Sequence, residues 1–145
     1  MYKRIVLAYD GSEAGQKSLL ACGDIAQWSK ANLFLIAVMP LTYAMMGIEG
    51  GFYSAEWQDQ EKQQYIGTLN DGLRRLGEAG YQAHGELLQG ETVQEITRYA
   101  KNANADLIVV GHKHQASWAK RWWQGSVSGS LIEQAPCSVL VVITG

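Results

Sequence analysis

The chain has 145 residues, of which 47% are hydrophobic and 18% charged, and its formal net charge at pH 7 is -2. This length suits one globular domain, residues 1–145, whose core needs no disulfide or metal to hold it together. The slightly acidic balance gives no electrostatic reason to expect binding to nucleic acids or membranes. No stretch reaches the length of a membrane span, and the first apolar run is too short for a signal peptide, so we expect a cytoplasmic protein.

Five apolar runs of strand length recur along the chain. They cover residues 5–9, 33–39, a weaker run at 81–88, 107–110 and 139–143. All except the third are continuous enough to predict burial on both faces. Segments with helical periodicity separate the runs, and this alternation predicts an α/β fold with a parallel sheet covered by helices on both sides.

Four segments have features that predict helices, most of them with apolar residues at steps of three and four. They are a segment after Asp10-Gly11-Ser12, one from near Ser54 to Gly77 or Gly80, one opened by the capping box Thr92-Val93-Gln94-Glu95, and one from Val127 to about Glu133. Either Asp10 or Ser12 can cap the first helix. Residues 40–53 and 112–124 have no regular pattern, and loops of that length in compact domains often form lids or binding surfaces.

Polar residues and glycines follow two of the predicted strands. In an open parallel sheet, ligands bind at the carboxyl ends of strands where the strand order reverses. Asp10 follows the first strand and Gly111 the fourth, so we expect the site between them. Downstream, the helix start Gly125-Ser126-Val127-Ser128 offers free amides, a positive dipole end and two hydroxyls, which suit a phosphate. An ordinary helix cap explains the same residues, and only their pairing with Gly111 favours the phosphate.

Four segments together resemble the universal stress protein family over the whole chain. They are Asp10-Gly11-Ser12, Val109-Val110-Gly111, Gly125-Ser126-Val127 and the closing run from Ala135-Pro136-Cys137 to Val142. This resemblance implies one doubly wound domain with a five-stranded parallel sheet in the order 3-2-1-4-5. It also implies a stress-response regulator that forms a homodimer through the last strand, residues 138–143, and works with a protein partner. Pairing would protect an apolar edge strand that is otherwise prone to aggregation.

The resemblance further implies a site for an adenine nucleotide, specifically ATP, with or without Mg²⁺. Asp10 would accept a hydrogen bond from a ribose hydroxyl. The other implied contacts are Ala8 at the base and ribose, Val38 at the adenine, Val110 and Gly111 at the ribose and phosphates, and Gly125, Ser126, Val127 and Ser128 at the phosphates.

The loop between these contacts departs from the family pattern of Gly, two residues, Gly, nine residues, Gly and Ser or Thr. His114 stands at the second glycine, and ten residues separate it from Gly125. A side chain there restricts the approach of the backbone to phosphates. Two outcomes remain open. Either His112, Lys113 or His114 compensates with hydrogen bonds or charge, or no nucleotide binds and the protein is an interaction module.

The same loop carries three tryptophans, Trp118, Trp122 and Trp123, beside Lys120 and Arg121. Indole rings so close together either pack against the fold or form a surface for a partner. His112 and His114 alternate without a third ligand, which favours solvent-facing loop residues over a metal site.

No catalytic constellation stands out in the sequence. Residues 9–14 lack the Ser-Gly-Gly-x-Asp-Ser loop of related ATP pyrophosphatases, and neither Walker A nor G-x-G-x-x-G occurs. At most, slow hydrolysis of ATP is expected. Cys22 and Cys137 stand in apolar surroundings without a C-x-x-C pair, so we predict two unpaired core cysteines in a reducing compartment.

Overall fold

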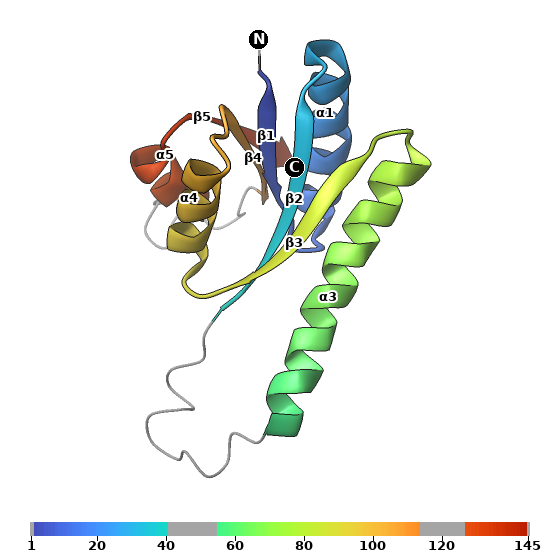
Figure 1. Ribbon diagram of the computed structural model, residues 1–145, viewed down its shortest axis with the longest axis vertical. Coiled ribbons are helices and arrows are strands. Elements are labelled where there is room, and N and C mark those ends of the chain that lie inside the picture. Colours follow the sequence, from blue (N-terminus) through green and yellow to red (C-terminus); the bar gives the residue numbers. More distant parts are fainter. Residues whose placement is uncertain (1, 41–54, 114–126, 145) are drawn as a thin grey trace.

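The structure, a computed structural model, describes residues 2–40, 55–113 and 127–144. Its elements are β1 (Arg4–Ala8), α1 (Glu13–Ser29), β2 (Asn32–Met39), α3 (Ala55–Glu78), β3 (Ala83–Gln89), α4 (Thr92–Asn102), β4 (Leu107–Lys113), α5 (Val127–Gln134) and β5 (Ser138–Thr144). All strand pairs are parallel, and the order β3-β2-β1-β4-β5 confirms the predicted doubly wound sheet (Figure 1).

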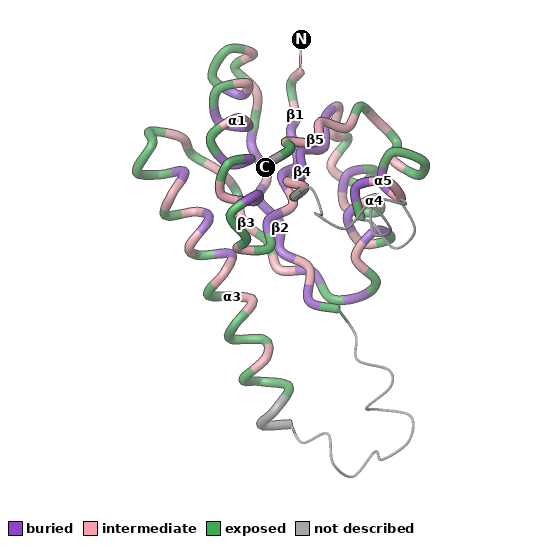
Figure 2. Tube along the Cα trace, turned by 180° about the vertical axis from the view of Figure 1, so that it is seen from behind, coloured by how far each residue is buried: buried purple, intermediate pink, exposed green. Residues whose placement is uncertain are grey.

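Helices cover both faces of the sheet, with α1 and α3 on one side and α4 and α5 on the other (Figure 1). Side chains alternate along a strand, so each strand contributes to both layers of the core. Leu7 and Val109 pack in the layer under α1 and α3, whereas Val6 and Ile108 pack in the layer under α4 and α5. Figure 2 shows the resulting pattern, with buried residues along the strands and exposed residues on the outer faces of the helices.

The two ends of the strand order are less buried than its centre. Burial on both faces was predicted for the last apolar run, and this prediction is wrong for β5 in the single chain. Residues 139–142 are half-buried and Ile143 is 56% exposed. The reason is position, because β5 has β4 as its neighbour on one side and forms the edge of the sheet.

The third strand begins two residues later than its apolar pattern predicts. Tyr81 precedes β3, and its ring lies over Gly23 of α1, where an added Cβ would be 2.4 Å from the ring. The Tyr81 hydroxyl donates a hydrogen bond to Asp24 at 2.7 Å, and its amide donates to the Leu76 carbonyl at 2.8 Å. Tyr81 therefore joins the ends of α1 and α3 instead of pairing in the sheet.

The structure confirms the predicted cap of α1 and corrects the predicted cap of α4. Ser12 caps α1, because its Oγ accepts a hydrogen bond from the Gly15 amide at 3.0 Å. The predicted capping box of Thr92 and Glu95 is wrong. Glu91 is the N-cap of α4, and its carboxylate accepts from the amides of the two residues after Thr92. The Glu91 carboxylate, one residue before Thr92, accepts hydrogen bonds from the amides at the start of the helix that have no partner within it. Thr92 is therefore the first helical residue.

The predicted core cysteines differ from each other. Cys22 is fully buried, and desolvation raises the pKa of its thiol to about 12, so it stays protonated as a small apolar side chain. Cys137 is only half-buried, and neither cysteine forms a disulfide. The other predicted loop features, residues 41–53 and the tryptophans at 118, 122 and 123, lie outside the described residues.

Candidate functional site

A cavity of about 300 Å³ lies at the carboxyl ends of β1, β2 and β4, where the strand order reverses. Helices α3, α4 and α5 each contribute one or two residues to it. The lining consists of Ala8, Tyr9, Asp10, Ile36, Val38, Pro40, Tyr65, Thr92, Ile96, Val110, Gly111 and Val127. Among these, Asp10 carries the charge, and the walls around it are mostly apolar.

Six of the ten predicted site residues line this cavity: Ala8, Asp10, Val38, Val110, Gly111 and Val127. Ser128 follows Val127 in the first turn of α5 and is buried, with an exposed fraction of 4%. The remaining three, His114, Gly125 and Ser126, lie outside the described residues. The fold thus gathers segments that are far apart in the sequence, as expected at a reversal of strand order.

Six further lining residues were not predicted as site residues: Tyr9, Ile36, Pro40, Tyr65, Thr92 and Ile96. Tyr65 and Ile96 belong to the apolar stripes of α3 and α4, so their spacing predicts packing and gives no sign of a site. Thr92 was interpreted only as a cap. The one sequence signal for a site residue among them is Pro40, which directly follows the second apolar run, because Tyr9 falls within the first predicted run.

Asp10 lies in a short turn with a fixed conformation. Its Oδ1 accepts a hydrogen bond from the Ser12 amide at 2.9 Å. Gly11 between them has a φ of 83°, in the left-handed region that glycine adopts without steric cost. The turn connects β1 to α1 and holds the Asp10 carboxylate at the edge of the cavity, where it can accept a hydrogen bond from a ligand hydroxyl.

Gly111, predicted only as a contact for the ribose and phosphates, also allows α1 to pack closely on β4. A Cβ at this position would lie 2.4 Å from the Ala14 carbonyl oxygen and 2.8 Å from the Gly15 amide nitrogen. The first turn of α1 therefore crosses β4 so closely that only glycine fits. Gly111 both lines the cavity and allows α1 to pack on the sheet, so a glycine here is required even without a ligand.

Tyr9 forms a rigid wall of the cavity. Its ring lies between Gly15 of α1 and Gly72 of α3, where added Cβ atoms would be 3.0 Å and 2.8 Å from ring carbons. Its hydroxyl donates a hydrogen bond to Asp71 at 2.9 Å. Burial, reinforced by Asp71, raises the pKa of Tyr9 to about 12, while hydrogen bonds from Arg75 and Tyr9 lower the pKa of Asp71 to about 2. The phenol is therefore neutral and the carboxylate charged at neutral pH.

His112 belongs to β4, so the predicted end of this strand at Val110 and the placement of His112 in a solvent-facing loop are both wrong. The strand continues because β5 extends alongside it, pairing Gly111 with Val142 and His112 with Ile143. The Nδ1 of His112 lies 3.5 Å from the Oγ of Ser128 in α5. An imidazole and a buried hydroxyl therefore meet at the start of this helix.

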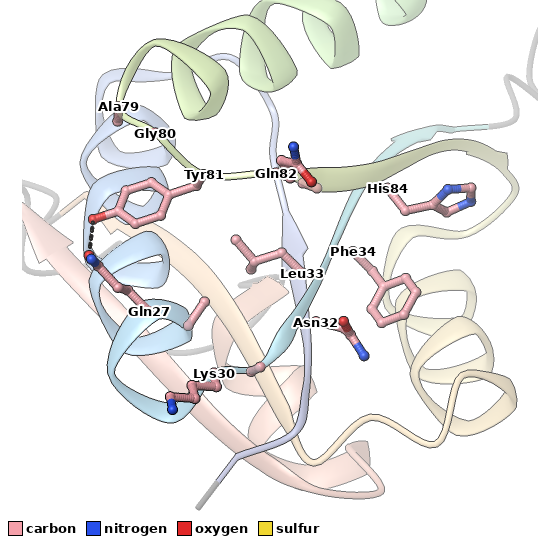
Figure 3. Close-up of a pocket in the computed structure, with 13 residues that line it drawn as sticks. Gln27, Lys30, Asn32, Leu33, Phe34, Ala79, Gly80, Tyr81, Gln82 and His84 are labelled. Carbon is pink, nitrogen blue, oxygen red and sulfur yellow. Dashed lines mark hydrogen bonds between the residues drawn. The ribbon is translucent and has the colours of Figure 1, made fainter.

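A second and larger recess, of about 810 Å³, lies at the opposite end of the sheet (Figure 3). It is an open depression between the end of α1 and the starts of β2 and β3. Several of its side chains have packing roles; for example, the Tyr81 hydroxyl oxygen lies 3.4 Å from the side-chain oxygen of Gln27. Size alone would select this recess, but the reversal of strand order and the predicted residues select the smaller cavity.

The described residues contain neither a group of metal ligands nor a membrane-spanning helix. Within residues 2–40, 55–113 and 127–144, no three His, Cys, Asp or Glu side chains are grouped as metal ligands would be. No helix in the same ranges has the length and apolar character needed to cross a bilayer.

The sequence matches the model of the universal stress protein family over residues 1–142. The chain belongs to this family. It is 29% identical to the universal stress protein YxiE of Bacillus subtilis, with 98% of this chain and 99% of the relative covered. It is 31% identical to the universal stress protein MJ0531 of Methanocaldococcus jannaschii, covering 98% of this chain and 82% of the relative.

Solved structures of the same fold include three with adenine nucleotides. A universal stress protein in complex with cAMP has a TM-score of 0.71 and 22% identity, over 97% of this chain and 96% of that one. A family member from Archaeoglobus fulgidus with dAMP has a TM-score of 0.69 and 21% identity, over 97% of this chain and 98% of that one. A family member from Arabidopsis thaliana with AMP bound has a TM-score of 0.67 and 17% identity, over 99% of this chain and 92% of that one. At these identities the likeness establishes the fold.

Proposed function

We propose that this protein binds an adenine nucleotide in the cavity at the carboxyl ends of β1, β2 and β4 and acts as a stress-response regulator. The observation that carries the proposal is the convergence of Asp10, Val38 and Gly111 with the start of α5 on one cavity. Family members with the same fold bind cAMP, dAMP and AMP. For this protein we propose ATP as one such adenine nucleotide, with Mg²⁺ accompanying its phosphates.

The cavity offers a different chemistry to each part of a nucleotide. Ile36, Val38 and Ile96 give apolar walls suited to the flat base, because burying a ring against aliphatic side chains removes apolar surface from water. Asp10 accepts a hydrogen bond from a ribose hydroxyl. The amides that begin α5 and the positive end of its dipole lie beside Val127, where phosphate oxygens are stabilised.

Mass spectrometry of the ligand released from freshly purified protein tests the proposal without assuming which nucleotide fits. Isothermal titration with AMP, cAMP and Mg-ATP then measures the affinity of each. We expect an adenine nucleotide in the first experiment and saturable heat in the second. If the purified protein carries no nucleotide and none of the three gives heat, the nucleotide proposal fails, and the interaction module that uses the tryptophan segment takes its place.

The variant Asp10→Ala tests the orientation of the ligand. Removing the carboxylate loses a charge-assisted hydrogen bond to the ribose, and we expect the affinity for AMP to fall about tenfold. The matched control is Asp59→Ala on the exposed surface of α3, which removes the same charge away from the cavity. Equal affinities of the two variants for AMP would contradict the placement of the ribose.

We propose that the regulator is a homodimer joined through β5. This strand is an edge of the sheet, and its exposed Ile143 and half-buried neighbours leave apolar surface uncovered in a single chain. The other edge strand, β3, carries the polar residues His84 and Glu86 instead. We expect sedimentation at micromolar concentration to show a dimer and Ile143→Lys to show a monomer. A monomeric parent protein would refute this arrangement.

A further inference from the structure

Thr92 lines the cavity with a hydroxyl that caps no helix. Glu91 is the N-cap of α4, and its carboxylate accepts hydrogen bonds from the Val93 amide at 3.2 Å and the Gln94 amide at 2.8 Å. Within residues 2–40, 55–113 and 127–144, no group forms a hydrogen bond with the Thr92 hydroxyl. Because Thr92 is part of the lining, this hydroxyl can donate to a ligand or accept from one.

Thr92 stands at the end of an apolar slot within the cavity. Ile96 lies one helical turn beyond it, so the two side chains project from the same face of α4, and both belong to the lining. Ile36 and Val38 of β2 pack in the same core layer as Ile96. Ile36 and Ile96 are 0% and 1% exposed, so the inner part of the slot is dry. A polar group that enters the slot must therefore find its hydrogen-bond partner on the protein.

The strand order places the base of the nucleotide in this slot. Asp10, the proposed ribose contact, follows β1, which has β2 on one side and β4 on the other. The proposed phosphate position beside Val127 belongs to α5, which packs on β4 and β5. From the ribose, the base then extends in the opposite direction, toward β2 and the helix α4 that packs on it. There it meets the apolar walls, with Thr92 at their end.

We propose that the Thr92 hydroxyl hydrogen bonds with the amino group at C6 of the adenine and makes the cavity selective for bases that carry a polar group there. This inference rests on the function proposed above. Two other hydroxyls occur in the described lining. Tyr9 donates its own to Asp71, and Tyr65 comes from α3, which covers the other face of the sheet (Figure 1). Thr92 is the hydroxyl on the wall that holds the base.

The chemistry of the slot explains why this contact selects between bases. The Thr92 oxygen accepts a hydrogen bond from the amino group through one of its lone pairs. A purine with hydrogen at C6 fits the same apolar walls but leaves the hydroxyl without that partner. Since the remaining walls are aliphatic, no other side chain of the slot replaces the lost hydrogen bond.

Titration of the full chain with AMP and with purine riboside 5′-monophosphate tests the inference, because the second ligand lacks only the amino group. We expect the parent protein to bind AMP about tenfold more tightly, the effect of one net hydrogen bond. Thr92→Val has nearly the same shape without the hydroxyl and should bind the two ligands with equal affinity. Thr92→Ser keeps the hydroxyl and should keep the preference for AMP.

Thr97→Val is the matched control, since it removes the same group from the same helix away from the lining, and it should retain the tenfold preference. Thr92→Ala is a further variant in case Thr92→Val unfolds, and thermal unfolding shows which variants are folded. The inference alone is overturned if the parent binds both ligands equally, or if a folded variant without the hydroxyl keeps the preference for AMP. If the parent protein binds neither ligand, the inference falls together with the proposed function.

Discussion

The two ends of the sheet differ in which helix ends meet there. At the carboxyl end, α1, α4 and α5 begin, so the positive ends of their dipoles lie on the side of the cavity of about 300 Å³. At the amino end, α1 and α3 end, so the negative ends of their dipoles lie on the side of the recess of about 810 Å³ (Figure 3). By this criterion the smaller cavity suits an anion better than the larger recess does. The direction of the helices decides which hollow suits a phosphate.

The largest effect is expected at the carboxyl end from Gly111→Ala. The new Cβ would lie 2.4 Å from a backbone oxygen, so α1 must move away from β4. We expect the free energy of unfolding to fall by about 3 kcal/mol and nucleotide affinity to be lost with it. Urea denaturation measures the first and isothermal titration the second.

The control for this variant is Gly67→Ala in α3, where no atom beyond the adjoining residues and the surrounding helix backbone lies within 4 Å of the added Cβ. Alanine is the better helix former, so this change should raise the free energy of unfolding by roughly 0.5–1 kcal/mol. Unchanged stability in Gly111→Ala would show that the close crossing of α1 and β4 is not present in solution.

The matching change at the amino end is Gly23→Ala. Its Cβ would meet the Tyr81 ring at 2.4 Å, but a side chain can move where a backbone cannot. We expect a loss of about 1–3 kcal/mol in the free energy of unfolding, with nucleotide affinity unchanged in the folded protein. A large loss of affinity in this variant would break the assignment of function to one end alone.

The Tyr9 and Asp71 contact links the cavity wall to α3. Tyr9→Phe removes a hydrogen bond to a charged group, and we expect a loss of about 1–2 kcal/mol, measured by urea denaturation. The pKa of Asp71 is lowered from 3.8 to about 2 in the folded protein. Its stabilising contribution is therefore complete above pH 4 and declines as the pH falls toward 2. Asp71→Asn should be less stable near neutral pH and should lack this part of the acid dependence.

The smallest effect is expected from Lys30→Gly, beside the amino-end recess. Lys30 ends α1 with a φ of 58°, a left-handed conformation in which glycine has no steric cost. We expect thermal unfolding to show a gain of about 0.5–1 kcal/mol. Nucleotide affinity should not change, and weaker nucleotide binding would indicate that the recess takes part in it after all.

The sequence predicted the fold more completely than it predicted the lining of the cavity. Apolar runs at the positions of β1, β2 and β4 are long and continuous, so their burial could be recognised from residue type. The start of β3 was misplaced because Tyr81, an aromatic residue suited to a strand, packs on Gly23 instead. Tyr65 and Ile96 were missed as cavity residues, since an apolar helix position looks the same whether it faces a core or a ligand.

By itself, the sequence determined the order and type of the elements, the family, and the placement of Asp10 and Gly111 toward the carboxyl ends of β1 and β4. These depend on local properties: hydrophobic period, caps and glycines. Only the tertiary structure decided that Gly111 is needed for α1 to cross β4, that Tyr9 is held by Asp71, and that His112 lies in β4 against Ser128. Each of these contacts joins elements distant in the chain, and no local pattern encodes the distance between two such elements.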